Sequence, residues 1–164
     1  MTASTAPTVP VTASTTPSDD ASVRRLVDIF AEGWNAARGE TLAQAFAPDA
    51  DFTNVMGLHA KGRDLIARGH DEILATVFRN TRVTPTVDRV RFLRSDVAVL
   101  DATFTLTHLD GRLFEMGPAG HSKAELVATK EQGRWSIAVF RNMIPFGRPL
   151  AGPLERSIAN ADRV

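Results

Sequence analysis

The chain changes from helical to strand-like patterning near Asn80 and does not change back. Before this point apolar residues recur three and four positions apart, as from Val23 to Ala37, which is the spacing of one helix face. After it, four segments alternate apolar and polar residues between turn signals; they cover 81–93, 97–108, 121–131 and 134–143. In the first of these the apolar phase shifts between Val87 and Val90, which predicts a bulge. Helices followed by antiparallel strands predict an α+β fold with the helices on one face of a sheet.

Three helices and one short strand are predicted before the sheet. The first helix begins at cap candidates in 18–20 and is expected to stop at Gly39. Residues 41–48 begin with a capping-box spacing and predict a short second helix that ends at a proline. A strand over 51–56 and a third helix over about 62–78 complete this half of the chain.

The two ends of the chain differ in composition from its middle. Residues 1–18 contain only Met, Thr, Ala, Ser, Pro and Val, so we expect 1–19 to be a disordered tail. This segment lacks the positive start and the apolar run of a secretory signal. The pattern fades again into a segment rich in Gly and Pro, which predicts a flexible C-terminal tail over 147–164. One folded domain is therefore predicted over 20–146.

Composition excludes several partners and several kinds of chemistry. The 19 Lys and Arg residues balance the 19 Asp and Glu residues, so the basic excess that favours nucleic acids or anionic membranes is missing. The absence of cysteine excludes disulfides, thiolate nucleophiles and Cys-ligated metals. The four histidines show no metal-ligand spacing, so we expect neither metal nor cofactor. With no export signal and no apolar run that could span a membrane, the cytoplasm is the expected location.

Polar residues that share the phase of apolar ones are the first candidates for a functional site. Asn54 shares the strand phase of Phe52 and Met56, and His70 follows Ile66 by one helical turn. A histidine turned inward suits proton transfer near neutral pH. The alternative is a core histidine that is bonded to a backbone carbonyl or to Asn54.

Further candidates lie on the first helix and on two late strands. Asn142 shares the strand phase of Phe140. It is either a cavity residue or an amide that satisfies backbone groups at the end of a strand. His108 continues the apolar face that contains Phe104. Trp34 lies on the inward face of the first helix. It is either a core residue or part of a wall on which a ligand stacks.

A set of motifs runs through the middle of the chain: Trp34–Glu40, Phe46–Asn54, Gly57, Gly62–Ile66, His70, Val90–Leu93, Asp96–Val99 and Gly133–Asn142. Together they resemble the nuclear transport factor 2-like superfamily, and most of all its SgcJ/EcaC group, which is related to SnoaL-like polyketide cyclases and ketosteroid isomerase. The resemblance covers about 20–146. It implies a cone-shaped, curved antiparallel sheet packed on three N-terminal helices, with one enclosed pocket and a homodimer formed through the open face of the sheet.

The resemblance also argues against one reaction. In ketosteroid isomerases the position that matches Asn54 carries an aspartate base, and the position that matches Phe30 carries an oxyanion tyrosine. This chain has no tyrosine, and an amide cannot abstract a proton. The predicted catalytic residues are therefore His70 and Asn54, and the predicted ligand-binding residues are Trp34, Phe30, Phe52, Met56, Phe104, His108, Phe140 and Asn142.

Three functions stay open at this point, because one fold can serve several. The first is a cofactor-independent pocket protein that acts on a small hydrophobic, polyketide-like metabolite by His-assisted acid/base chemistry, as an isomerase, cyclase, dehydratase or hydrolase. The second is a non-catalytic binding or accessory module of a biosynthetic pathway. The third is a dimerisation domain whose pocket is filled by its own side chains.

Overall fold

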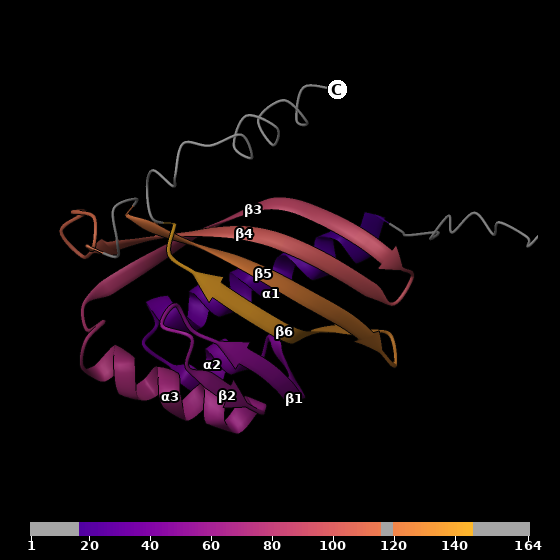
Figure 1. Cartoon of the computed structure of the whole chain (residues 1–164), viewed down its shortest axis with the longest axis horizontal. Helices are drawn as coiled ribbons and strands as arrows, with labels where there is room; N and C mark the ends of the chain where they lie inside the picture. The colour runs from indigo at the N-terminus through magenta and orange to yellow at the C-terminus, as the bar shows by residue number, and fades with distance from the viewer. Residues whose placement is uncertain (1–16, 116–119, 146–164) are drawn as a thin grey trace, which may run out of the picture.

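The computed structural model describes residues 17–115 and 120–145. Residues 1–16 of the predicted tail over 1–19 and the predicted tail over 147–164 lie outside them. Two helices, a hairpin and a third helix precede four long strands (Figure 1). The elements are α1 (Pro17–Asn35), α2 (Gly39–Ala43), β1 (Phe46–Thr53), β2 (His59–Lys61), α3 (Arg63–Ala75), β3 (Thr81–Arg94), β4 (Val97–His108), β5 (His121–Glu131) and β6 (Arg134–Met143). The predicted α+β class is confirmed, and β2 is an addition to it. None of the described helices is long and apolar enough to cross a membrane.

Helix α1 begins earlier than predicted, at Pro17. Residues 17–19, which the composition assigned to the N-terminal tail, are its first residues. The buried carboxylate of Asp19 accepts hydrogen bonds from Lys130 Nζ on β5 (2.7 Å) and from Trp135 Nε1 on β6 (2.8 Å). A carboxylate in the first turn also suits the positive end of a helix. These contacts join the start of α1 to the sheet.

The predicted second helix over 41–48 is too long, because β1 already starts at Phe46. Gly39, which was expected to stop the first helix, begins α2, whose N-cap makes no side-chain hydrogen bond. A Cβ on this glycine would lie 2.0 Å from the carbonyl oxygen of Ala67 in α3, so the close approach of the two helices requires glycine. Pro48 has no N–H to donate to a neighbouring strand. It is tolerated in β1 because the pairing with β6 is interrupted between Phe46 and Asp51 by a register shift.

The strands form one curved sheet in the order β2-β1-β6-β5-β4-β3. The prediction of a purely antiparallel sheet is wrong at one pair, because β1 runs parallel to β6 while the other neighbours are antiparallel. A parallel pair needs a long crossover, and here α3 and the strands β3 to β5 provide it. The predicted bulge is confirmed by a register shift between Val87 and Arg89 in β3.

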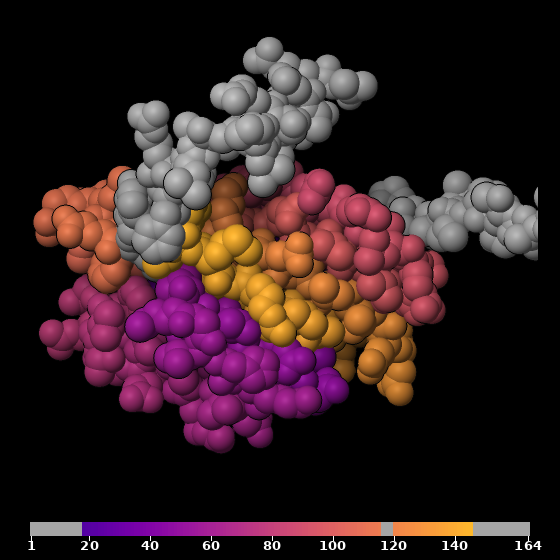
Figure 2. All heavy atoms as spheres, viewed as in Figure 1, coloured from indigo at the N-terminus to yellow at the C-terminus, as the bar shows by residue number. Residues whose placement is uncertain are grey.

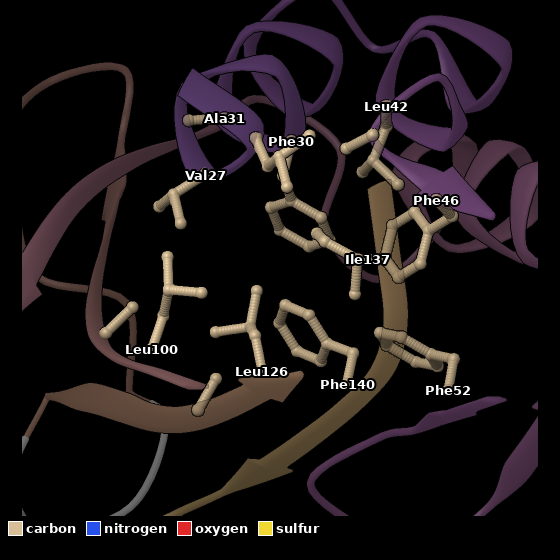
Figure 3. Close-up of a cluster of buried hydrophobic side chains, with 14 of the residues drawn as sticks. Val27, Phe30, Ala31, Leu42, Phe46, Phe52, Leu100, Leu126, Ile137 and Phe140 are labelled. Carbon is tan, nitrogen blue, oxygen red and sulfur yellow. The ribbon is translucent and has the colours of Figure 1, made fainter. Parts of the chain in front are cut away.

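The core lies between α1 and the inner face of the sheet and contains several aromatic rings (Figure 3). Figure 3 shows Phe30 of α1 pointing toward Phe140 of β6, and their stacked rings have centroids 5.2 Å apart. Phe52 of β1 also stacks on Phe140, at 5.1 Å. Along β4 every second residue from Ala98 to Leu106 is buried, as the alternation predicted. Full burial of a large side chain such as Leu100 or Phe104 stabilises the fold by roughly 1.5–3 kcal/mol.

The outer face of the sheet has no described helix over β5 and β6 (Figures 1 and 2). Val99, Val127 and Val139 are cross-strand partners on β4, β5 and β6, and they form a half-buried apolar row on this face. The neighbouring row is charged and has Asp101 and Arg141 at its ends. This face therefore combines an apolar centre with a polar border.

Candidate functional site

A cavity of about 460 Å³ opens between α1, α3 and the inner face of the sheet, which is within the size range of small-molecule sites. Eight of the ten predicted site residues line it: Phe30, Trp34, Phe52, Asn54, Met56, His70, Phe104 and Asn142. They come from both long helices and from several strands, so the fold brings together residues far apart in the sequence. The spacing of apolar residues along each helix and strand was sufficient to predict which of these side chains point inward.

Two predicted lining residues lie elsewhere. His108 ends β4, with its ring 5.2 Å from that of Phe114, and lines a separate hollow. Its strand face was predicted correctly, but β4 extends past the end of the cavity. Phe140 is fully buried, because the rings of Phe30 and Phe52 stack against it and separate it from the cavity.

The walls of the cavity are mainly apolar from its depth to its mouth. Four buried aromatic side chains line the deep part, namely Phe30, Trp34, Phe52 and Phe104. The apolar side chains at the mouth are 45–79% exposed, namely Met56, Leu58, Leu65 and Val77. Such a concave apolar surface with few polar groups is typical of sites that bind hydrophobic ligands.

His70 is held in the cavity wall by its own helix. It is buried on α3, and its Nδ1 lies 2.8 Å from the carbonyl oxygen of Ile66, one turn earlier. A carbonyl oxygen can only accept, so Nδ1 carries the proton and donates it. The lone pair of the neutral ring is then on Nε2, which has no hydrogen-bond partner among the described residues.

The surroundings of His70 keep its ring neutral. The ring contacts Phe52 edge-on with centroids 5.1 Å apart, and Phe30 and Trp34 lie at 5.7 and 6.2 Å. Burial lowers the pKa of His70 from its ordinary value of 6.5, against the smaller opposing effects of the Ile66 carbonyl and of Asp71. His70 is therefore bonded to a backbone carbonyl and also lines the cavity, and its role in proton transfer stays a prediction.

Asn54 stands where β1 ends and the chain turns. Its Oδ1 accepts hydrogen bonds from the backbone N–H groups of Met56 and Leu58, both at 2.9 Å. Gly57 completes the turn with a φ of 80°, a conformation that favours glycine. The oxygen of Asn54 is thus committed to the turn, and the Nδ2 amide is its remaining polar group beside the cavity.

The sheet contributes two more polar side chains. Asn142 on β6 accepts the N–H of Met143 through Oδ1 (3.1 Å), which also leaves its Nδ2 without a partner among the described residues. Ser122 on β5 lines the cavity and was missed. It shares the buried phase of Ala124 and Leu126, so the same test that selected Asn54 could have found it.

The sequence also missed much of the mouth. Leu58, His59 and Ala60 line it because β2 folds back on β1 after the turn. Val77 and Phe78 reach it from the other side, just after the end of α3. The turn had a readable signal, an asparagine followed three residues later by glycine, but a strand of three residues has too little alternation to be recognised.

Charged groups are scarce at this site. No Lys or Arg is among the described residues that line the cavity. Glu72 is exposed, and His59 is half-exposed beside Asp51, with Nε2 3.3 Å from its carboxylate. The described part of the chain contains no group of three His, Asp or Glu residues that could hold a metal ion.

No protein-family model matches the chain, and a search of curated proteins finds no relative. Many solved structures are similar to it. A domain of unknown function with a cystatin-like fold from Nostoc punctiforme is 28% identical, with a TM-score of 0.72 over 91% of this chain and 88% of that one. An NTF2-like protein with a cystatin-like fold from Novosphingobium aromaticivorans is 17% identical, with a TM-score of 0.68 over 86% and 88%. A ketosteroid isomerase-like protein from Erwinia carotovora is 14% identical, with a TM-score of 0.59 over 78% and 97%. The chain therefore has a cystatin-like fold.

Proposed function

We propose that this protein binds a small hydrophobic molecule in the cavity and that His70 removes a proton from it. The observation that carries the proposal is a buried, neutral imidazole whose unshared Nε2 lies in the wall of an apolar cavity. A base in such a place is protected from water and correctly protonated at neutral pH. The likeness to a ketosteroid isomerase-like protein supports proton-transfer chemistry.

The proposed step uses only groups of this chain. The Ile66 carbonyl fixes the tautomer of His70, and Nε2 accepts a proton from a carbon next to a ligand carbonyl. The C–H electron pair moves onto the carbonyl oxygen as an enolate, which the Nδ2 amide of Asn142 or Asn54 stabilises by donating a hydrogen bond. The protonated ring then returns the proton to another atom of the ligand. Isomerisation, cyclisation and dehydration can all begin in this way.

A second function is favoured by a specific observation. Among the described residues no carboxylate is bonded to the side chain of His70, and its Nδ1 is bonded to a backbone carbonyl. In addition, Asn54 offers an amide where ketosteroid isomerases carry an acid. Both features fit a module that binds a metabolite without changing it. The dimerisation hypothesis with a filled pocket fits less well, because the cavity is open.

Deuterium exchange separates the two functions. Tetralone, a bicyclic ketone, is incubated with the protein in D₂O, and incorporation of deuterium beside the carbonyl is followed by mass spectrometry. We expect exchange catalysed by the wild type and lost by about 100-fold or more in His70→Gln. The control is His108→Gln, whose side chain lies outside the cavity. Binding of tetralone without exchange would establish the non-catalytic module, and equal exchange in both variants would contradict the role of His70.

Two finer assignments are proposals as well. We propose membership of the SgcJ/EcaC group, which rests on the motifs around Trp34, Phe46–Asn54 and His70. We also propose a homodimer formed through the outer face of the sheet. The apolar row of Val99, Val127 and Val139 supports it, since β-branched residues in register are suited to pack against a second sheet.

A further inference from the structure

The hydrogen-bonding groups of the cavity differ in kind between its walls. The helix wall offers an acceptor, because the tautomer of His70 is fixed by the Ile66 carbonyl and leaves Nε2 unprotonated. A hydroxyl group can donate to this nitrogen. A carboxylate or a ketone has no proton to donate, so neither satisfies it.

The strand wall offers donors. Asn142 and Asn54 both use Oδ1 to accept backbone N–H groups, and each keeps an Nδ2 that no described residue occupies. An Nδ2 amide can only donate, and its natural ligand partner is a carbonyl oxygen. Ser122 adds a hydroxyl that can act in either sense.

The charge of the site restricts the ligand further. A carboxylate or phosphate would enter an apolar space in which none of the described lining residues is Lys or Arg. Burial of an unpaired anion is costly. The carboxylates of Glu72 at the mouth and of Asp51 beside His59 would oppose its approach.

From these three observations we infer that the ligand is an uncharged hydroxy-carbonyl compound on an apolar skeleton. Its hydroxyl donates to Nε2 of His70, and its carbonyl accepts from Nδ2 of Asn142. This inference rests on the proposed binding function and names the class of molecule that the cavity selects. It concerns binding only: while the hydroxyl donates to Nε2 of His70, this nitrogen cannot accept a proton from carbon, so the proposed proton transfer requires that hydrogen bond to be released first.

A matched series of ligands on one skeleton tests the inference. The series is tetralin, tetralone, tetrahydronaphthol, a tetralone with a phenolic hydroxyl, and the same tetralone with a carboxylate in place of the hydroxyl. Dissociation constants are measured by titration calorimetry at neutral pH. We expect the hydroxytetralone to bind about tenfold more tightly than tetralone or tetrahydronaphthol, which is the effect of one hydrogen bond. The carboxylate should bind most weakly.

Two variants assign the two hydrogen bonds. In His70→Phe the hydroxytetralone should lose its advantage over tetralone, and in Asn142→Leu it should lose its advantage over tetrahydronaphthol. His108→Phe, on the same fold but outside the cavity, should keep both advantages. The comparison among ligands on the wild type stands on its own if a variant fails to fold.

The outcomes separate the inference from the proposed function. Tight binding of tetralin or of the carboxylate would overturn the inference and leave a small-molecule cavity in place. A hydroxyl advantage that persists in His70→Phe would also overturn it. If no member of the series binds, both the inference and the proposed function fail.

Discussion

At the scale of single residues, the site depends on how existing hydrogen bonds limit what each polar side chain can still do. His70 and Asn142 each use one polar atom on the backbone of their own element, and the other atom is left for the cavity. The sequence predicted that both side chains point inward, because side-chain phase follows from the period of a helix or strand. It could not predict which atom is free, since that depends on the rotamer in the folded chain.

The pH dependence of stability tests the state of His70. Burial lowers the pKa of His70 in the folded chain below its ordinary value of 6.5. At a pH between the folded and the unfolded pKa, the unfolded chain therefore binds a proton on His70 that the folded chain does not. Stability therefore falls as the pH drops from 7 through 6.5 toward the folded pKa. We expect His70→Phe to remove this part of the loss, measured by urea unfolding at a series of pH values.

Two carboxylates with lowered pKa values do not disturb this window. Asp88 and Asp110 have pKa values lowered by hydrogen bonds, to Thr103 and Arg112 respectively, so their contribution is lost only as the pH falls below 3.8. An unchanged slope between pH 7 and 5 in His70→Phe would show that the ring of His70 is protonated in the folded state or exposed to water.

At the scale of helices and strands, close contacts between backbones decide where glycine is required. Gly33 of α1 faces α2, and a Cβ there would lie 2.1 Å from the backbone nitrogen of Leu42. A Cβ on Gly69 of α3 would meet no atom of the described residues within 4 Å outside its own turn of helix. The two glycines are alike in sequence, since both interrupt a helix, and only the packing distinguishes them.

Alanine at these two positions should have opposite effects. We expect Gly33→Ala to destabilise the fold by about 1–3 kcal/mol, since the backbone of α2 must move. Gly69→Ala should stabilise it by up to about 1 kcal/mol, the difference in helix propensity. Urea unfolding gives both values, and equal effects of the two changes would contradict this packing of α1 against α2.

Element prediction was most reliable where the pattern is long. The alternation of β4 predicted its buried face correctly, and the order of the three helices and of the last four strands was also correct. Prediction failed at 41–48, where Pro48 suggested the end of a helix but lies in a strand beside a register shift. It also failed for the parallel pairing of β1 with β6. This pairing depends on the path of the chain through α3 and the strands β3 to β5, which brings β6 back beside β1.

At the scale of the whole molecule, the sheet has two faces with different roles. The inner face carries the core and the cavity, and the outer face carries the row of Val99, Val127 and Val139. The phase of the helices and strands located eight lining residues, but it could not show where the cavity ends. His108 and Phe140 were misplaced for that reason, one beyond the end of the cavity and one behind its wall.

The proposed dimer gives a prediction about the outer face. We expect light scattering to report twice the mass of one chain for the wild type and a single chain for Val127→Lys, because a charge at the centre of the apolar row would have to be buried. The control is Leu109→Lys, an exposed residue just after β4 and away from the row. A monomeric wild type would contradict the dimer without affecting the cavity.

Nitrogen NMR of the imidazole side chains tests the central claim most directly, because the two ring nitrogens report tautomer and charge separately. For His70 at neutral pH we predict a neutral ring with a protonated Nδ1 and an unprotonated Nε2. Addition of the hydroxytetralone should shift Nε2 as it accepts a hydrogen bond, while Nδ1 stays in place. A doubly protonated ring, the opposite tautomer, or an Nε2 signal that a bound ligand leaves unchanged would contradict the account.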